Sequence, residues 1–194
     1  MLLFGLPTRS LIRFPYPLAY LLIGMMLGAP QRSALQAAEN DTQIGKRAPE
    51  WELVNLEAGK THSNQFKGKV QVLNFWATWC PPCVAAIPHM NDLQKQYASD
   101  VVCVGISDEN ESKFLEGLKK RNLNASSFNY ALGLDDSGRM KSAFQIKGIP
   151  HVAVMSSDWV VRWQGHPTEL TAEVMNAIIS GNRSLEASSA RAGP

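Results

Sequence analysis

The chain has 194 residues, which is room for one ordinary domain. Hydrophobic residues make up 45% of it and charged residues 19%, values that suit a folded core and exclude a disordered chain. The formal net charge of +2 at pH 7 gives no electrostatic reason to expect nucleic acid as a partner. Three cysteines allow one intramolecular disulfide and exclude a framework of several.

The first 38 residues have the layout of an export signal. They contain three arginines and no acid, and residues 18–29 form an uncharged apolar run followed by small residues. That run is shorter than the roughly 20 residues of a membrane-spanning helix. We therefore expect residues 1–38 to be a signal peptide or an N-terminal membrane anchor, with residues 18–29 as the tether. The protein is then extracytoplasmic (periplasmic or secreted), either free or anchored to the cytoplasmic membrane.

The pattern after the leader predicts one domain over residues 39–180 and a flexible tail over residues 181–194. Apolar, β-prone runs predict strands at 51–57, 70–76, 101–106, 130–134, 151–155 and 160–164. Helical periodicity predicts helices at 84–97 with a kink at Pro88, at 111–122, in a short segment ending near 144, and at 168–180. Alternating strands and helices indicate an α/β fold, and the short link between the last two strands makes the central sheet mixed.

Two of these helices have an expected buried face. In the helix at 111–122 the inward residues are Phe114, Leu115 and Leu118. In the last helix, Leu170, Val174 and Ile178 recur four apart on one face.

The residue types that carry chemistry meet in Trp79-Cys80-Pro81-Pro82-Cys83, between a predicted strand and a predicted helix start. Two cysteines three apart at a helix start can close a small ring. Unpaired N–H groups and the positive end of the helix dipole stabilise a thiolate there, which lowers the pKa of Cys80 from about 8.5. We expect an accessible Cys80 to attack a substrate disulfide and a buried Cys83 to release the mixed disulfide.

Other uses of the pair also fit the spacing. Cys-x-x-Cys can be half of a zinc site, although no second paired-ligand unit is present in the sequence. A structural disulfide is a further alternative, although so tight a loop constrains few residues. We predict no metal and no cofactor. Cys103 lies in an apolar strand, where packing explains it best.

The segment Asn74–Cys83, with Gly148-Ile149-Pro150 about 67 residues later, resembles the thioredoxin superfamily. Within it, residues 45–180 look like the TlpA/ResA-like group of extracytoplasmic thiol–disulfide oxidoreductases. The resemblance implies a thioredoxin-like fold, with helices on both faces of the central mixed sheet. It also implies that Cys80 and Cys83 are the catalytic, redox-active disulfide. Trp79, Ile149 and Pro150 then position the substrate, and the Ile149–Pro150 peptide is cis.

Two positions depart from the family pattern. Thioredoxin has a buried Asp where this chain has Asn74, and ResA-like members commonly have a Glu where it has Ala86. Neither residue here can titrate, so the proton of Cys83 needs another route. Asn74 as a hydrogen-bonding group, together with His151 or His89, is the candidate relay, and each His is otherwise an ordinary packed or surface residue.

The resemblance implies a reductase of client disulfides that serves cell redox homeostasis and cytochrome c-type biogenesis. Its partners are disulfide-containing client proteins and a membrane thiol that donates electrons, because an oxidising compartment does not supply them. The alternative is a thioredoxin-like copper metallochaperone that uses Cys80, Cys83 and a His such as His151, since soft thiolates favour Cu(I). A peroxidase finds less support, because no suitable Thr/Cys environment is evident.

Overall fold

The computed structural model describes residues 43–55 and 59–192. Residues 41–194 form one compact unit. The expected signal or anchor at residues 1–38, with its tether at 18–29, lies outside the described residues. Across the described ranges, no helix combines the length and the apolar character needed to cross a membrane.

A mixed sheet of seven strands forms the centre of this unit, in the order β2-β1-β5-β4-β3-β6-β7. β3, β4 and β5 are parallel neighbours, and the remaining pairs are antiparallel. The antiparallel pairing expected for the last two strands is therefore confirmed. The strands are β1 (Glu52–Asn55), β2 (Gly59–His62), β3 (Val70–Phe75), β4 (Val101–Ser107), β5 (Ala131–Leu134), β6 (His151–Met155) and β7 (Val161–Gly165). β2 is not among the predicted strands, because its sequence, Gly-Lys-Thr-His, has no apolar residue.

The helices lie close to the predicted ranges, with one break where a kink was expected. α2 (Pro81–Ala85) ends at Ala86, and α3 (Ile87–Gln96) starts there with Pro88 in its first turn. Proline is tolerated at that place because the first N–H groups of a helix have no intrahelical acceptor. The others are α4 (Glu111–Lys120), α5 (Arg139–Ala143) and α6 (Ala172–Ala192).

α6 is longer than the sequence predicted and continues past the expected end at Ser180 to Ala192. Asn182, which is buried, explains part of this difference. Its side chain donates to the Gly68 carbonyl at 3.1 Å and accepts from the Ser157 amide at 2.6 Å. These contacts fix the helix at Asn182 against the segments that flank β3 and β6.

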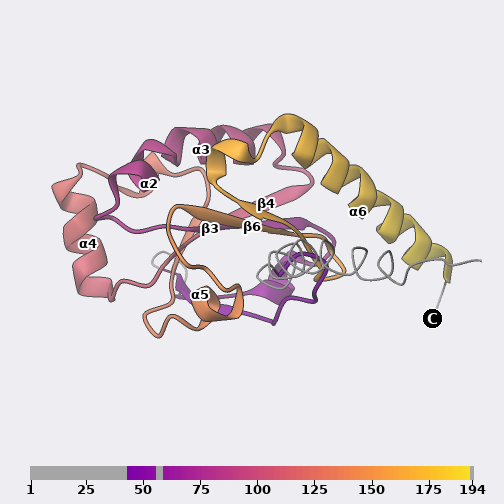
Figure 1. The fold of residues 1–194 in the computed structure, drawn as a ribbon, viewed down its shortest axis with the longest axis horizontal. Coiled ribbons are helices and arrows are strands. Elements are labelled where there is room, and N and C mark those ends of the chain that lie inside the picture. The colour runs from indigo at the N-terminus through magenta and orange to yellow at the C-terminus, as the bar shows by residue number, and fades with distance from the viewer. Residues whose placement is uncertain (1–42, 56–58, 193–194) are drawn as a thin grey trace, which may run out of the picture. The chain divides into compact units, whose positions relative to one another are not determined.

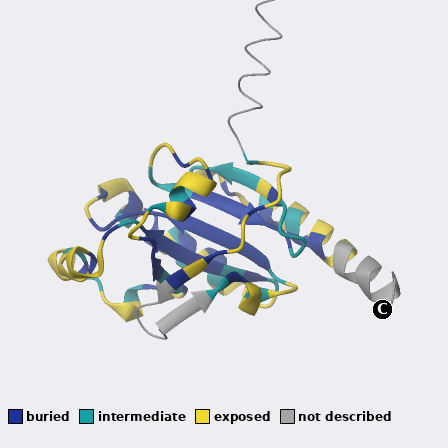
Figure 2. Ribbon diagram, turned by 90° about the horizontal axis from the view of Figure 1, so that it is seen from below, coloured by how far each residue is buried: buried dark blue, intermediate teal, exposed yellow. Residues whose placement is uncertain are grey.

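Strand residues alternate between the two faces of the sheet, as the period of two requires. On β3, Val70 and Val72 join one buried cluster, and Leu73 and Phe75 join the other. α3, α4 and α6 supply the first cluster, whereas α5 and the segment before β1 supply the second. Helices therefore lie on both faces, as expected (Figure 1). The strands form the buried centre, with exposed residues around it (Figure 2).

The predicted buried faces of two helices need correction. Phe114 and Leu118 are buried on α4, but Leu115 is 49% exposed. Leu170, which lies just before α6, is buried, and Val174 and Ile178 pack half-buried against the same cluster, as predicted. The most deeply buried apolar positions of α6 are the residues that follow these two, Met175 and Ile179. In both cases the helical period was right, and the direction of the covered face was set by neighbouring elements.

Candidate active site

The cysteine pair stands where the central strand β3 passes into α2. Cys80 is the N-cap residue of α2 and forms a disulfide with Cys83 (S–S distance 2.03 Å). The Cys83 amide donates to Cys80 Sγ at 3.3 Å. Pro81 and Pro82 occupy the first helical positions, where they remove no helical hydrogen bond. The Cys83 amide is directed at Cys80 Sγ, where it can stabilise a negative charge on that sulfur once the disulfide is opened.

Cys80 is less accessible than the sequence led us to expect. Cys80 is 4% exposed and Cys83 is 1% exposed. The carbonyl oxygen of Ile149 lies 4.0 Å from Cys80 Sγ and covers it from the facing loop. By contrast, the neighbouring Trp79 is 62% exposed. An incoming disulfide therefore meets a broad aromatic ring beside a largely covered sulfur.

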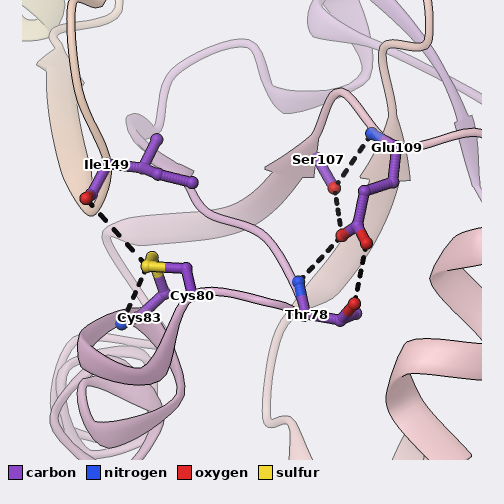
Figure 3. The surroundings of a disulfide bond; sticks show 6 residues. All are labelled: Thr78, Cys80, Cys83, Ser107, Glu109 and Ile149. Atoms are coloured by element: carbon purple, nitrogen blue, oxygen red, sulfur yellow. Dashed lines mark hydrogen bonds between the residues drawn. A yellow bond between two sulfur atoms is a disulfide. The ribbon is translucent and has the colours of Figure 1, made fainter.

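The Ile149–Pro150 peptide is cis, as expected. Antiparallel pairing of β3 with β6 brings Phe75 opposite His151, so the loop before β6 lies beside the end of β3. Figure 3 shows the Ile149 carbonyl directed at the disulfide. The structure thus brings Cys80, Cys83 and Ile149 together, although they come from segments about 70 residues apart.

Asn74 lies on β3 between Gly105 of β4 and Val152 of β6, and it is 2% exposed. Its Oδ1 has no hydrogen-bond partner in the described part of the chain. Tyr130 is close by, and burial raises the pKa of its hydroxyl; nearby Cys103 raises it further, whereas the Asn74 side chain opposes the shift. Nothing in the sequence pattern marks Tyr130 as a buried neighbour of Asn74.

His151 is half-buried at the start of β6. Burial lowers the pKa of its imidazole, Glu169 counteracts this, and His166 reinforces it. His89, the other histidine considered, is half-buried on α3. Within residues 43–55 and 59–192, no three His, Cys, Asp or Glu side chains are grouped to hold a metal ion.

Sequence analysis missed a carboxylate that contacts the loop before the redox pair. Glu109 follows β4, is 9% exposed, and accepts hydrogen bonds from the amide and the hydroxyl of Thr78 at 2.8 and 2.7 Å. Ser107 donates to the same carboxylate at 2.9 Å. Figure 3 shows these contacts beside the disulfide. In the sequence, Glu109 sits in a short polar stretch that is typical of a solvated loop.

Comparisons with known proteins agree with this geometry. Thiol-disulfide oxidoreductase ResA of Bacillus thuringiensis is 29% identical over 120 residues, which cover 62% of this chain and 68% of the relative. Thioredoxin-like protein YneN of Bacillus subtilis is 38% identical over 93 residues, which cover 46% of this chain and 55% of the relative. The structure of a thiol:disulfide interchange protein DsbE from Chlorobium tepidum matches with a TM-score of 0.61 at 23% identity. The match covers 70% of this chain and 97% of that structure.

The structural match confirms the thioredoxin-like fold, and the ResA relatives confirm the resemblance seen in the sequence. The family model described as AhpC/TSA matches residues 44–165, which is more than half of the chain. The chain therefore belongs to the AhpC/TSA family, and within it this is a thioredoxin-like thiol–disulfide oxidoreductase.

Proposed function

We propose that this oxidoreductase is an extracytoplasmic reductase of disulfides in client proteins. The observation that carries the proposal is the Cys80–Cys83 disulfide at the end of β3, with the Ile149 carbonyl against Cys80 Sγ. The Ile149 carbonyl beside Cys80 Sγ and the exposed Trp79 ring together suit a protein substrate better than a small one. The export-signal pattern of residues 1–38 supports the location.

The exchange proceeds in two steps that balance. The Cys80 thiolate attacks one sulfur of a client disulfide, so that a mixed disulfide forms and the first client thiolate leaves. The Cys83 thiolate then attacks Cys80 Sγ, which closes the Cys80–Cys83 disulfide and releases the second client thiolate. The client gains two electrons and binds two protons, and the cysteine pair loses two electrons. The Cys83 amide, directed at Cys80 Sγ, stabilises that sulfur both as nucleophile and as leaving group.

Client binding in this proposal uses the backbone beside the sulfur. An extended client segment pairs with the Ile149 backbone next to Pro150, in the manner of an added β-strand, while Trp79 packs against it. Main-chain hydrogen bonds of this kind hold many sequences, so one such site can serve several clients. The Ile149 carbonyl then stands within reach of both the client backbone and Cys80 Sγ.

Proton transfer to and from Cys83 is assigned to Asn74 and His151 in this proposal. Asn74 is buried and can orient a proton carrier by hydrogen bonding, but it cannot titrate. His151 is half-buried at the start of β6 and has a lowered pKa, chiefly because of burial, so its neutral imidazole can accept a proton near pH 7.

Each turnover leaves the pair oxidised, so a donor must return two electrons. A membrane dithiol fits this requirement, because an extracytoplasmic compartment is oxidising. The tether at residues 18–29 would keep the domain close to such a donor. We place the protein in cytochrome c-type biogenesis, where apocytochrome cysteines must be kept reduced, as the family resemblance implies.

Reduction of insulin by the full chain with dithiothreitol tests the proposal. Wild type and Cys103→Ala should both accelerate precipitation of the insulin chains, because Cys103 is buried and outside the pair. Cys80→Ser should match the rate of dithiothreitol alone, and if wild type does the same, the reductase proposal is wrong. Equilibration with glutathione buffers then gives the direction: a potential of about −270 mV, as for thioredoxin, fits a reductase, whereas about −120 mV, as for DsbA, fits an oxidase.

A further inference from the structure

We infer that Glu109 is a positioning residue for the redox pair, acting through Thr78. This inference rests on the proposed thiol–disulfide exchange at Cys80. It assigns a role to Glu109, which lies outside the Trp79–Cys83 motif. Thr78 lies two residues before Cys80, and the turn between them is closed by a hydrogen bond from the Cys80 amide to the Ala77 carbonyl at 3.2 Å. A displacement of Thr78 is therefore passed directly to the first reactive sulfur.

Glu109 holds both the backbone and the side chain of Thr78. Its Oε2 accepts from the Thr78 amide at 2.8 Å, and its Oε1 accepts from the Thr78 hydroxyl at 2.7 Å. Thr78 is 2% exposed, so water cannot replace these contacts without a rearrangement. Two contacts on one residue fix its position and its orientation, which a single contact cannot do.

Ser107 fixes the carboxylate in turn. Its hydroxyl donates to Glu109 Oε2 at 2.9 Å and accepts from the Glu109 amide at 3.2 Å, which closes a ring between the two residues. Ser107 is the last residue of β4 and is fully buried. The carboxylate is thus attached to a rigid strand, and Figure 3 shows the sequence of contacts from Ser107 through Glu109 to Thr78.

The neighbouring acid shows that this arrangement is specific to Glu109. Asp108 is adjacent in sequence, but its carboxylate forms an ion pair with Lys141 at 2.8 Å and is about one-third exposed. One carboxylate is directed outward to a lysine, and the next is directed inward to the active-site loop. An acidic loop placed there only for solubility would not bury its second member on three donors.

A helix backbone also packs against the Thr78 side chain. A Cβ atom on Gly117 of α4 would lie 1.9 Å from Thr78 Oγ1, so the helix backbone packs directly against this side chain. Thr78 therefore contacts both the carboxylate of Glu109 and the backbone of α4. These contacts restrain the loop that places Cys80 at the start of α2, with its sulfur beside the Ile149 carbonyl.

Glutamine at position 109 separates geometry from charge. Its carbonyl oxygen can accept from the Thr78 amide and the Ser107 hydroxyl, while its NH₂ group donates to the Thr78 hydroxyl, which then accepts. All three contacts survive and the charge is lost. Glu109→Ala removes both the contacts and the charge, and Thr78→Val removes only the hydrogen bond of the Thr78 hydroxyl. Asn182→Ala is the matched control, because it removes a buried polar anchor at the opposite ends of β3 and β6.

The test measures Cys80 in the full reduced chain in two ways, as the pH profile of its alkylation by iodoacetamide and as the rate of insulin reduction. We expect Glu109→Ala to shift the alkylation profile and to slow insulin reduction between about tenfold and a hundredfold, as misplacement of a reacting group by about 1 Å does. Thr78→Val should slow it about fivefold, in line with one lost hydrogen bond. Glu109→Gln should stay within about twofold of wild type, since its contacts are retained.

Three results would overturn the inference. Glu109→Ala could fold and leave both readouts unchanged, Glu109→Gln could be as slow as Glu109→Ala, or Asn182→Ala could shift the alkylation profile as far. A slow Glu109→Gln variant would assign the effect to charge, and an equal shift in Asn182→Ala would assign it to general loss of stability. If Glu109→Ala does not fold, Thr78→Val carries the same test. Failure of wild type to reduce insulin would reject the proposed reductase and leave the alkylation comparison valid.

Discussion

The side chain of Thr78 fills the space that a Cβ atom on Gly117 would need, with Thr78 Oγ1 only 1.9 Å from that position and Thr78 Cβ 2.5 Å from it. Glycine in a helix interior usually costs about 1 kcal/mol relative to alanine. Glycine is needed here because α4 lies directly against the loop that carries Cys80. Alanine at position 117 should therefore destabilise the fold, although it favours the helix.

Gly117→Ala should therefore lower the free energy of unfolding by up to about 2 kcal/mol. The overpacking cost of about 1–3 kcal/mol exceeds the gain in helix propensity of about 1 kcal/mol. The same change should slow insulin reduction, because the loop must move. Urea unfolding and the insulin assay measure the two effects.

Gly181→Ala is the control for Gly117→Ala, since both glycines lie inside helices. A Cβ atom on Gly181 would meet nothing within 4 Å. The propensity gain should then stand alone and raise the free energy of unfolding by up to about 1 kcal/mol. If Gly117→Ala also stabilised the protein, the close approach of α4 to Thr78 would be contradicted.

Local sequence patterns were sufficient to predict the centre of the fold and of the site. β3 is mostly apolar and β-prone, which is typical of a buried central strand, and all six of its residues are buried. The cysteine pair follows it within ten residues. A strand end next to a helix start places reactive groups at one edge of a sheet in any sequence of this type. The mixed sheet could be predicted from local patterns, because a short link joins its last two strands. The Cys80–Cys83 redox disulfide followed only from the family resemblance, because the spacing alone left zinc and a structural disulfide open.

Tertiary contacts decided what the sequence could not. Asp108 and Glu109 are adjacent acids with the same local pattern, and only the approach of the active-site loop separates an exposed ion pair from a buried carboxylate. Leu115 follows the helical period but lies beyond the surface that the sheet covers. The extension of α6 depends on Asn182, whose partners are 114 and 25 residues away.

Trp79→Ala should weaken client binding with little effect on stability. The side chain is 62% exposed, and substitutions at such surface positions usually change the free energy of unfolding by less than about 0.5 kcal/mol. An aromatic contact worth about 1.4 kcal/mol gives a tenfold rise in KM for a protein client. Reduction of a small disulfide such as oxidised glutathione should stay unchanged.

Ile44→Ala is the matched control for Trp79→Ala, because Ile44 is another exposed apolar side chain, 46% exposed, and lies in the segment beside β7. KM should be unaffected by this change. An equal rise in KM for Trp79→Ala and Ile44→Ala would assign the effect to general surface hydrophobicity and contradict a binding role of Trp79.

Cys103 should make the protein sensitive to alkaline pH. Burial raises the pKa of its thiol above the ordinary value of 9.0, so the folded state keeps the proton after the unfolded chain has lost it. Stability from this group is present below pH 9 and is lost as the pH rises, by up to about 1.4 kcal/mol per pH unit. Burial also raises the pKa of the Tyr130 hydroxyl above its ordinary value of 10.0, so its contribution to stability is likewise lost as the pH rises above 10.

The Cys103 effect is measured as a difference between variants. Urea unfolding from pH 8 to 11 in a Cys80→Ser/Cys83→Ser background, where Cys103 is the remaining thiol, prevents disulfide exchange. The stability gap between this protein and its Cys103→Ala derivative should shrink above pH 9. A constant gap would mean that the thiol ionises equally in both states.

His151 should titrate below 6.5, with a direction of change that identifies its neighbours. Burial lowers the pKa of the imidazole, Glu169 raises it, and His166 lowers it. Glu169→Gln should therefore move the midpoint further down, and His166→Gln should move it up. Because the folded value is lowered, the stability that His151 contributes is present above pH 6.5 and is lost as the pH falls below it. The imidazole proton resonances in NMR spectra, recorded from pH 4.5 to 8, give the midpoints directly. A midpoint at or above 6.5 in the wild-type protein would show that His151 is open to solvent. Unchanged midpoints in both variants would show that it is remote from Glu169 and His166.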